Sequence, residues 1–145
     1  MQNLVFDEGY KEFTINGDEN RVIRFNPSDV AMLKRLNEAK DKILEAMKVK
    51  KDIELDEEGK PIESLENASK IVGHIDDTIK EQINYIFNYE VADVVFGNQS
   101  PMANINGLPL YVRFMDSIKP VIEKAMKEEN EKSRKRVEKY TKVIK

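Results

Sequence analysis

The sequence predicts an α+β fold, with an N-terminal β-hairpin or small antiparallel sheet packed on a bundle of about three to four helices. Apolar and polar residues alternate within the first 26 residues, which is the period of a half-buried strand. Beyond residue 28, apolar residues recur every three or four positions, which is the period of a helix with one buried face. We therefore expect a single domain (1–145) with a β-hairpin region (1–26), a helical bundle (28–126) and a charged C-terminal tail (127–145).

The hairpin is predicted from two short segments, 10–15 and 21–25, in which every second residue is apolar. The loop between them, at 16–20, is rich in Asn, Gly and Asp, which favour hairpin turns. An isolated two-stranded hairpin is marginally stable in water, so we expect helices beneath it or a third strand, for which residues 3–6 are the candidate. The side chains predicted to share the buried face are Phe13, Ile15, Ile23 and Phe25.

The first helix is predicted to begin after Pro27, with Ser28 or Asp29 as its N-cap, and to run to about Lys51. An acidic turn follows at Asp52–Pro61. The apolar stripe of this helix comprises Val30, Leu33, Leu36, Ile43, Leu44 and Met47.

The second helix is predicted to run from Ser64 to about Phe96. A straight helix of that length would span roughly 50 Å, which exceeds the diameter of a small globule. A bend is therefore expected at Gly73 or within 84–89. The predicted buried line comprises Leu65, Ala68, Val72, Ile75, Ile79, Ile83 and Ile86.

A third helical stripe follows, and Pro120 inside it should end or bend the helix near Lys119. From Lys127 onward the apolar residues thin out among charges, so this tail is expected to be helical only in part. Residues 127–145 hold eight Lys or Arg and four Glu, a balance of +4 in a chain whose net charge is −3. The stripe comprises Leu110, Phe114, Ile118, Val121, Ile122 and Met126.

The segment Phe96–Leu110 separates the second and third predicted helices with two Gly, two Pro and three Asn, which favour turns. It nevertheless keeps several apolar residues, which a solvent-exposed linker would lack. We expect the segment to fold back over the core or to dock a partner. The residues hypothesised to bind that partner are Phe96, Met102, Ile105, Leu108, Leu110 and Phe114.

The composition limits the compartment and the chemistry. The chain contains no Cys, which excludes disulfides, thiol catalysis and thiolate metal sites. No apolar run approaches the roughly 20 residues of a membrane helix, and the N-terminus lacks the basic-then-apolar order of a signal peptide. We expect a soluble protein of a reducing cytoplasm.

His74 is the only histidine, and Asp77 follows it one helical turn later. A general base needs a nucleophile and an orienting group as well, and nothing in the sequence completes such a set. A phosphate-binding Gly motif, a zincin helix and a paired-carboxylate signature are all missing from the sequence. We therefore predict a non-enzymatic protein with no catalytic, cofactor-binding or metal-binding residues.

Four acidic residues between positions 52 and 63 match part of a calcium-loop template. Glu57 occupies the position at which the template needs Gly, and Gly59 occupies one that is usually apolar. A solvated acidic turn is therefore the better interpretation. The matching residues are Asp52, Glu54, Asp56 and Glu63.

The basic residues of the tail could neutralise phosphates, which would make binding strongly salt-dependent. Four Glu are interspersed among them, and Tyr140 alone is a poor stacking platform, which argues against nucleic-acid binding. The basic residues are Lys132, Arg134, Lys135, Arg136, Lys139 and Lys142.

Four parts of the sequence carry a family resemblance: NLVFDEGYKEFTING, VIRFNPSD, VFG with the later NGLP, and KYTK. They resemble a family of small tail-region proteins from phages and prophages of Gram-positive bacteria, and the similarity extends from Asn3 to Lys142. The resemblance implies a role in virion morphogenesis in the cytoplasm of the bacterial host cell. Its most specific form is a tail assembly chaperone, which coats the long helical tape-measure protein until tube subunits replace it. This family has no catalytic residues to carry over.

Two other functions remain open. The chain could be a structural tail component, such as a completion or connector ring subunit, or a nucleic-acid-binding regulator that uses the basic tail. The predicted partners are therefore the tape-measure protein or another tail protein, together with further copies of this chain, since open strand edges suit self-association.

Overall fold

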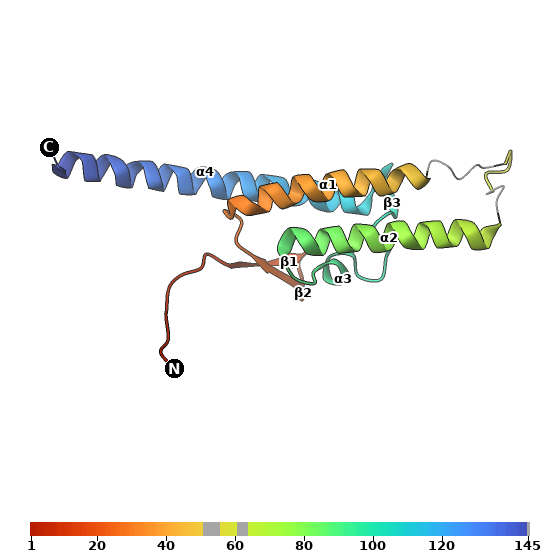
Figure 1. Cartoon of the computed structure of the whole chain (residues 1–145), viewed down its shortest axis with the longest axis horizontal. Helices are drawn as coiled ribbons and strands as arrows, with labels where there is room; N and C mark the ends of the chain where they lie inside the picture. The colour runs from red at the N-terminus through yellow and green to blue at the C-terminus, as the bar shows by residue number, and fades with distance from the viewer. Residues whose placement is uncertain (51–55, 61–63, 145) are drawn as a thin grey trace.

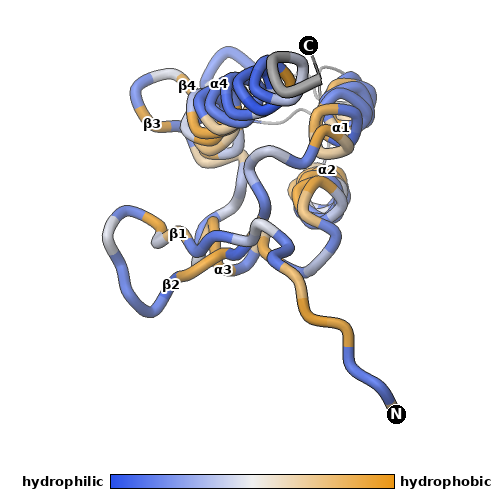
Figure 2. Tube along the Cα trace, turned by 90° about the vertical axis from the view of Figure 1, so that its left-hand side faces the viewer, coloured by the Kyte–Doolittle hydropathy of each residue, from blue (hydrophilic) through white to orange (hydrophobic). Residues whose placement is uncertain are grey.

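The computed structural model describes residues 1–50, 56–60 and 64–144. The predicted α+β class is confirmed, because an antiparallel hairpin is followed by helices. Figures 1 and 2 place this hairpin and a short helix together on one side of three long helices. The elements are β1 (Lys11–Ile15), β2 (Asp18–Phe25), α1 (Val30–Lys50), α2 (Leu65–Phe87), α3 (Ala92–Phe96), β3 (Asn104–Ile105), β4 (Leu108–Pro109) and α4 (Leu110–Ile144).

The hairpin turns through Asn16 and Gly17, whose φ angles of 52° and 76° suit a two-residue hairpin turn. β2 therefore begins at Asp18, and the predicted loop at 16–20 is shorter than expected. The pairing register shifts between Thr14 and Ile15, where the longer β2 strand accommodates extra residues. The predicted shared face is confirmed: Ile23 and Phe25 are buried, and Phe13 and Ile15 pack against the same core.

The third strand predicted at residues 3–6 is wrong for the single chain. These residues have no regular secondary structure. Figure 1 shows the N-terminal segment continuing away from β1 instead of folding back beside it. In the part of the chain that the structure describes, the hairpin packs against helices and pairs with no third strand.

α1 begins after Asp29, whose Oδ1 accepts a hydrogen bond of 3.0 Å from the Ala31 N–H. Asp29 rather than Ser28 is therefore the N-cap. The predicted end near Lys51 agrees with the last described helical residue, Lys50.

The predicted stripe of α1 is only partly buried. Ile43 lies in the core, and Leu36 and Met47 pack against it. Met32 and Ala39, which were not predicted to be buried, complete the buried face of α1. The burial predicted for Val30, Leu33 and Leu44 is wrong: these side chains are exposed, because α1 packs on α2 through an adjacent face.

α2 begins after Ser64, whose hydroxyl oxygen accepts a hydrogen bond of 3.2 Å from the Asn67 N–H. It ends at Phe87 because Asn88 adopts a left-handed conformation with φ of 62°. The helix predicted to reach Phe96 is therefore divided within the 84–89 region, while Gly73 does not interrupt it. Leu65 and Val72 are exposed, and the other predicted core residues, Ala68, Ile75, Ile79, Ile83 and Ile86, are buried.

α3 is connected to its neighbours by side-chain hydrogen bonds. Asn84 Oδ1 accepts hydrogen bonds of 2.8 Å from the N–H groups of both Val91 and Ala92. Arg21 on β2 donates from Nε to the Val94 carbonyl at 2.8 Å and from Nη2 to the Val95 carbonyl at 2.5 Å. Both ends of this short helix are thus attached to flanking elements.

α4 is continuous from Leu110 to Ile144. Of the two effects predicted for Pro120, an end or a bend of the helix near Lys119, the end is therefore wrong. The prediction of a tail helical only in part is also wrong for the described residues 127–144. Lys, Glu and Arg are good helix formers, and adding turns to an existing helix avoids the cost of nucleation. Figure 1 shows the C-terminal half of α4 projecting beyond the rest of the molecule.

Aromatic rings connect the elements of the core. The Phe25 ring lies 4.6 Å from the Phe13 ring and 5.1 Å from the Phe87 ring, measured between centroids. The Phe114 ring lies 6.0 Å from that of Phe87 and 6.2 Å from that of Phe96. The hairpin, α2, α3 and α4 therefore share one aromatic cluster.

Candidate functional site

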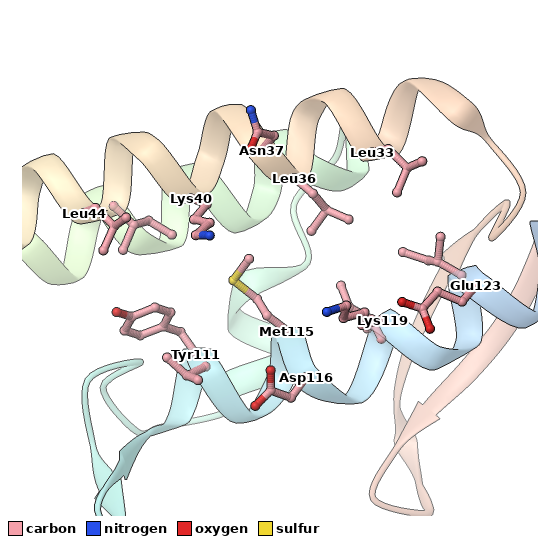
Figure 3. Close-up of a pocket in the computed structure, with 14 residues that line it drawn as sticks. Leu33, Leu36, Asn37, Lys40, Leu44, Tyr111, Met115, Asp116, Lys119 and Glu123 are labelled. Atoms are coloured by element: carbon pink, nitrogen blue, oxygen red, sulfur yellow. The ribbon is translucent and has the colours of Figure 1, made fainter.

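A groove of about 490 Å³ lies between α1 and the first half of α4. Figure 3 shows side chains from the two helices facing each other across it. The apolar residues that line it are Leu33, Leu36, Ile43, Leu44, Tyr111, Val112, Met115, Ile118 and Ile122. We call this cavity the α1–α4 groove.

The groove is apolar because α1 carries exposed apolar side chains on the face that it turns toward α4. Leu33 and Leu44 retain 47% and 51% exposure, although α1 packs firmly on α2. Met115 and Val112 on α4 pack partly against the core on the opposite side of the groove. The apolar faces of α1 and α4 thus lie opposite each other but are not in full packing contact, which leaves the groove between them.

The polar rim of the groove has mixed charge. Lys40 and Lys119 carry positive charge, and Asp116 and Glu123 carry negative charge. Burial raises the pKa of the Tyr111 hydroxyl above its ordinary value, which reinforces the neutral, hydrogen-bond-donating form that tyrosine already has at physiological pH. The groove therefore suits an apolar surface bordered by charges of both signs.

A second cavity, of about 500 Å³, separates the hairpin from α4. Residues of β1 and the core face of β2 form one wall, and α4 forms the other. We call this cavity the β1–α4 wedge. Its apolar lining comprises Phe13, Ile15, Ile23, Phe25, Val95, Ile105, Leu110, Phe114, Ile118 and Val121.

The structure separates the six residues predicted to bind a partner. Phe96, Met102 and Phe114 belong to the core, with Phe96 only 2% exposed, so these three do not form a surface. Leu110 packs partly against the core. Ile105 and Leu108 remain 40% and 43% exposed on the small β3–β4 hairpin. Of the six residues, Ile105, Leu108 and Leu110 therefore remain candidates for contact with a partner.

Replacing Ile105 or Leu108 with Ala is expected to lower the free energy of unfolding by less than about 1 kcal/mol, because both side chains are already half in water. Phe96→Ala should cost about 3–5 kcal/mol, as buried aromatic truncations do. Urea denaturation measures all three variants. A loss of 2 kcal/mol or more at Ile105 or Leu108, the order seen for core truncations, would make the hairpin structural.

The α1–α4 groove was not predicted as a specific site, because Leu33 and Leu44 belong to an apolar stripe that the sequence predicts to be mostly core. A signal was present: the apolar residues of α1 occupy two lines, one through Met32 and Ile43 and another through Leu33 and Leu44. A stripe this wide indicates a helix with a second neighbour.

The other sequence candidates are not brought together. His74 is exposed on α2. Asp56 Oδ1 accepts hydrogen bonds of 2.9 Å from the N–H groups of Glu58 and Lys60, which builds a turn. The remaining calcium-template residues, Asp52, Glu54 and Glu63, lie outside the described residues.

The basic residues of the tail lie on the projecting half of α4, among the four Glu. Lys132 forms an ion pair of 3.9 Å with Glu129, so part of the basic charge is compensated on the same helix. This arrangement is that of a solvated helix surface.

No cluster of three or more His, Asp or Glu side chains suited to a metal ion occurs in residues 1–50, 56–60 and 64–144. In the same part of the chain, none of the helices combines the length and apolar character needed to cross a bilayer. Comparison of the chain with protein-family models, with curated proteins and with solved structures found no match.

Proposed function

We propose that this chain is a non-enzymatic tail-morphogenesis protein that holds an amphipathic helix of the tape-measure protein, as a tail assembly chaperone does. The observation that carries the proposal is the α1–α4 groove, in which two apolar helix faces lie close together but leave room between them. The resemblance of the N-terminal, central and C-terminal motifs to phage tail-region proteins supplies the biological context.

The groove has the dimensions of a helix-binding site. Leu33 and Leu44 are eleven positions apart on α1, which corresponds to roughly 16 Å along a helix. That distance is about three turns, enough for three or four apolar residues of a partner helix to contact the groove. A tape-measure protein is mostly long amphipathic helix, so its apolar stripe needs such a cover before assembly.

The chemistry of the groove suits reversible binding. Met115 is flexible and adapts to differently shaped side chains. The rim charges of both signs, Lys40 and Lys119 against Asp116 and Glu123, tolerate partner helices with mixed polar faces. A chaperone that must release its client gains from many modest contacts and needs no covalent chemistry.

Leu33→Asp and Leu44→Asp are expected to weaken binding of the tape-measure fragment at least tenfold. Each change removes a contact worth about 1.5–3 kcal/mol when buried, and tenfold corresponds to about 1.4 kcal/mol. The measurement is co-expression with a helical fragment of a tape-measure protein, followed by titration calorimetry of the purified pair.

Val72→Asp is the matched control, because Val72 is an exposed apolar residue on α2 that does not line the groove. It should bind as the unmodified chain does, and circular dichroism should show all three variants folded. If the control weakens binding as much as Leu33→Asp, the groove is not the client site.

A structural tail component is the second candidate, favoured by the exposed apolar N-terminal segment and the projecting half of α4, which suit permanent assembly. Mass spectrometry of purified particles separates the two functions. A chaperone should be missing from finished tails, whereas a ring subunit should be present in a fixed number of copies.

A further inference from the structure

Residues 1–6 form an arm that is exposed along its length, with Phe6 bordering a cavity beside Tyr10 and Met32. Leu4 and Val5 are both 87% exposed, and Phe6 is 71% exposed. Figure 2 shows this apolar stretch leaving the body of the molecule. Three consecutive apolar side chains in water are unfavourable, so the arm has the composition of a segment that is buried in an assembly.

A hydrogen-bonded turn at residues 7–9 fixes the direction in which the arm leaves β1. Gly9 has a φ of +78°, and its N–H donates a hydrogen bond of 2.8 Å to Asp7 Oδ1. Asn26 Nδ2 donates to the Glu8 carbonyl at 3.3 Å. A Cβ at Gly9 would lie 2.8 Å from Asn26 Nδ2, so the turn depends on glycine. The same chain would have to disrupt this turn to fold its arm back along β1.

The outer edge of β1 is a surface to which an extended segment such as the arm could bind as an added strand. In the described part of the chain, β1 has a hydrogen-bonded neighbour on one side only, which is β2. β2 packs beside α3, and its Arg24 N–H donates to the Tyr89 hydroxyl, so the outer edge of β2 is partly occupied and the edge of β1 is the one available for pairing. The β1–α4 wedge adjoins this strand, and its lining is mostly apolar. An added strand would extend the sheet toward α4 and place side chains in the wedge.

We propose that residues 3–6 of a second copy of this chain pair with the edge of β1 as a third strand. Alternate side chains of a strand point to opposite faces. Leu4 and Phe6 would enter the wedge beside Phe13 and Ile15, and Val5 would lie on the outer face of the sheet.

Charge complementarity supports this occupant. Asp7 and Glu8 directly follow the apolar residues of the arm. Arg113 lines the wedge, and its Nη2 donates to the Ile105 carbonyl at 2.7 Å, which holds the guanidinium at this position. The acidic pair of the arm would therefore approach a fixed positive charge. The third strand predicted from the sequence thus forms between two chains instead of within one.

The inference does not depend on the proposed function, because the wedge and the α1–α4 groove are separate cavities. Binding of the tape-measure fragment should survive loss of the arm, and association between copies should survive Leu33→Asp. Failure of one proposal is therefore distinguishable from failure of the other.

The chain contains no Cys, so introduced cysteines report contacts directly. A tagged Val5→Cys chain is mixed with an untagged Thr14→Cys chain, or with Glu12→Cys for the neighbouring register. Facing residues on paired strands lie close enough for a disulfide. We expect a two-chain disulfide product in the mixture, and a Val72→Cys partner on α2 should give none.

Two outcomes would overturn the proposal. One is a yield of two-chain product no higher with Thr14→Cys and Glu12→Cys than with Val72→Cys. The other is a disulfide within the single chain of the Val5→Cys/Thr14→Cys double variant, which would place the arm on its own β1.

Deletion of residues 1–8 gives an independent measurement by light scattering. We expect the unmodified chain to form a species larger than one chain and the deletion to leave only monomer, with the helical circular dichroism retained. A full chain that stays monomeric at all concentrations, or a deletion that associates unchanged, would contradict the inference.

Discussion

Replacing Phe87 with Ala is expected to lower the free energy of unfolding by about 3–5 kcal/mol, the range seen when buried aromatic residues are truncated. Phe87 is buried at the end of α2, and its ring lies between those of Phe25 and Phe114. Its loss would leave a cavity where the hairpin, α2 and α4 meet. Because small domains are stable by only about 5–15 kcal/mol, this is a large fraction of the total.

Urea denaturation followed by circular dichroism measures this change, with Val72→Ala as the matched control on the same helix. Val72 is exposed, so its truncation should cost less than about 1 kcal/mol. A loss at Phe87 no larger than that of the control would show that the aromatic cluster contributes little to stability.

Replacing Asn84 with Ala is expected to lower the free energy of unfolding by about 2–4 kcal/mol, because leaving a buried N–H without an acceptor costs about 1–3 kcal/mol. Asn84 Oδ1 accepts from the N–H groups of Val91 and Ala92, both of which are buried residues at the start of α3. The loss should appear as a lower urea midpoint.

Asn84→Asp separates the hydrogen bonds from other effects of the substitution. The carboxylate keeps the accepting oxygen in place, so this variant should stay within about 1 kcal/mol of the unmodified chain. Equal destabilisation by Asp and Ala would mean that the amide N–H₂ group, and not the acceptor, holds α3 in place.

Both predictions concern the framework around α4, which supplies a wall to each cavity. Phe114 on α4 belongs to the aromatic cluster and lines the wedge, while Met115, the next residue, lines the groove. Adjacent positions on a helix point in different directions, so one helix serves two separate surfaces. The stability of the cluster therefore determines the shape of both.

Local sequence signals predicted most of the elements. Asn16 and Gly17 specify the hairpin turn, Asp29 and Ser64 cap α1 and α2, and the alternating residues of the hairpin identified its buried face. These features depend on interactions between residues close in the chain, and such interactions are readable from residue type and spacing.

Predictions that required knowledge of distant neighbours were less accurate. α4 continues through Pro120, although a proline removes a helical hydrogen bond. α2 does end in the predicted 84–89 region, but the sequence did not predict that the chain would leave the helix there and start α3 at Ala92. Asn84 favours this break by accepting from the Val91 and Ala92 amides. Propensity alone does not include such contacts.

For the candidate sites as well, the sequence predicted local features but not those that depend on tertiary contacts. The sequence identified the apolar residues of each helix and loop, including Leu33, Leu44, Ile105 and Leu108. It did not show which of these apolar residues are buried and which are exposed. Phe96 and Ile105 carry equivalent apolar signals, yet one is in the core and the other on the surface.

The amino-acid sequence by itself determined the α+β class, the buried face of the hairpin and the starts of α1 and α2, because short-range hydrogen bonds and periodicity decide these features. The tertiary structure alone decided which apolar faces meet and which remain open as the groove and the wedge. Helix faces are covered only when another element lies against them, and that placement depends on the packing of the whole chain.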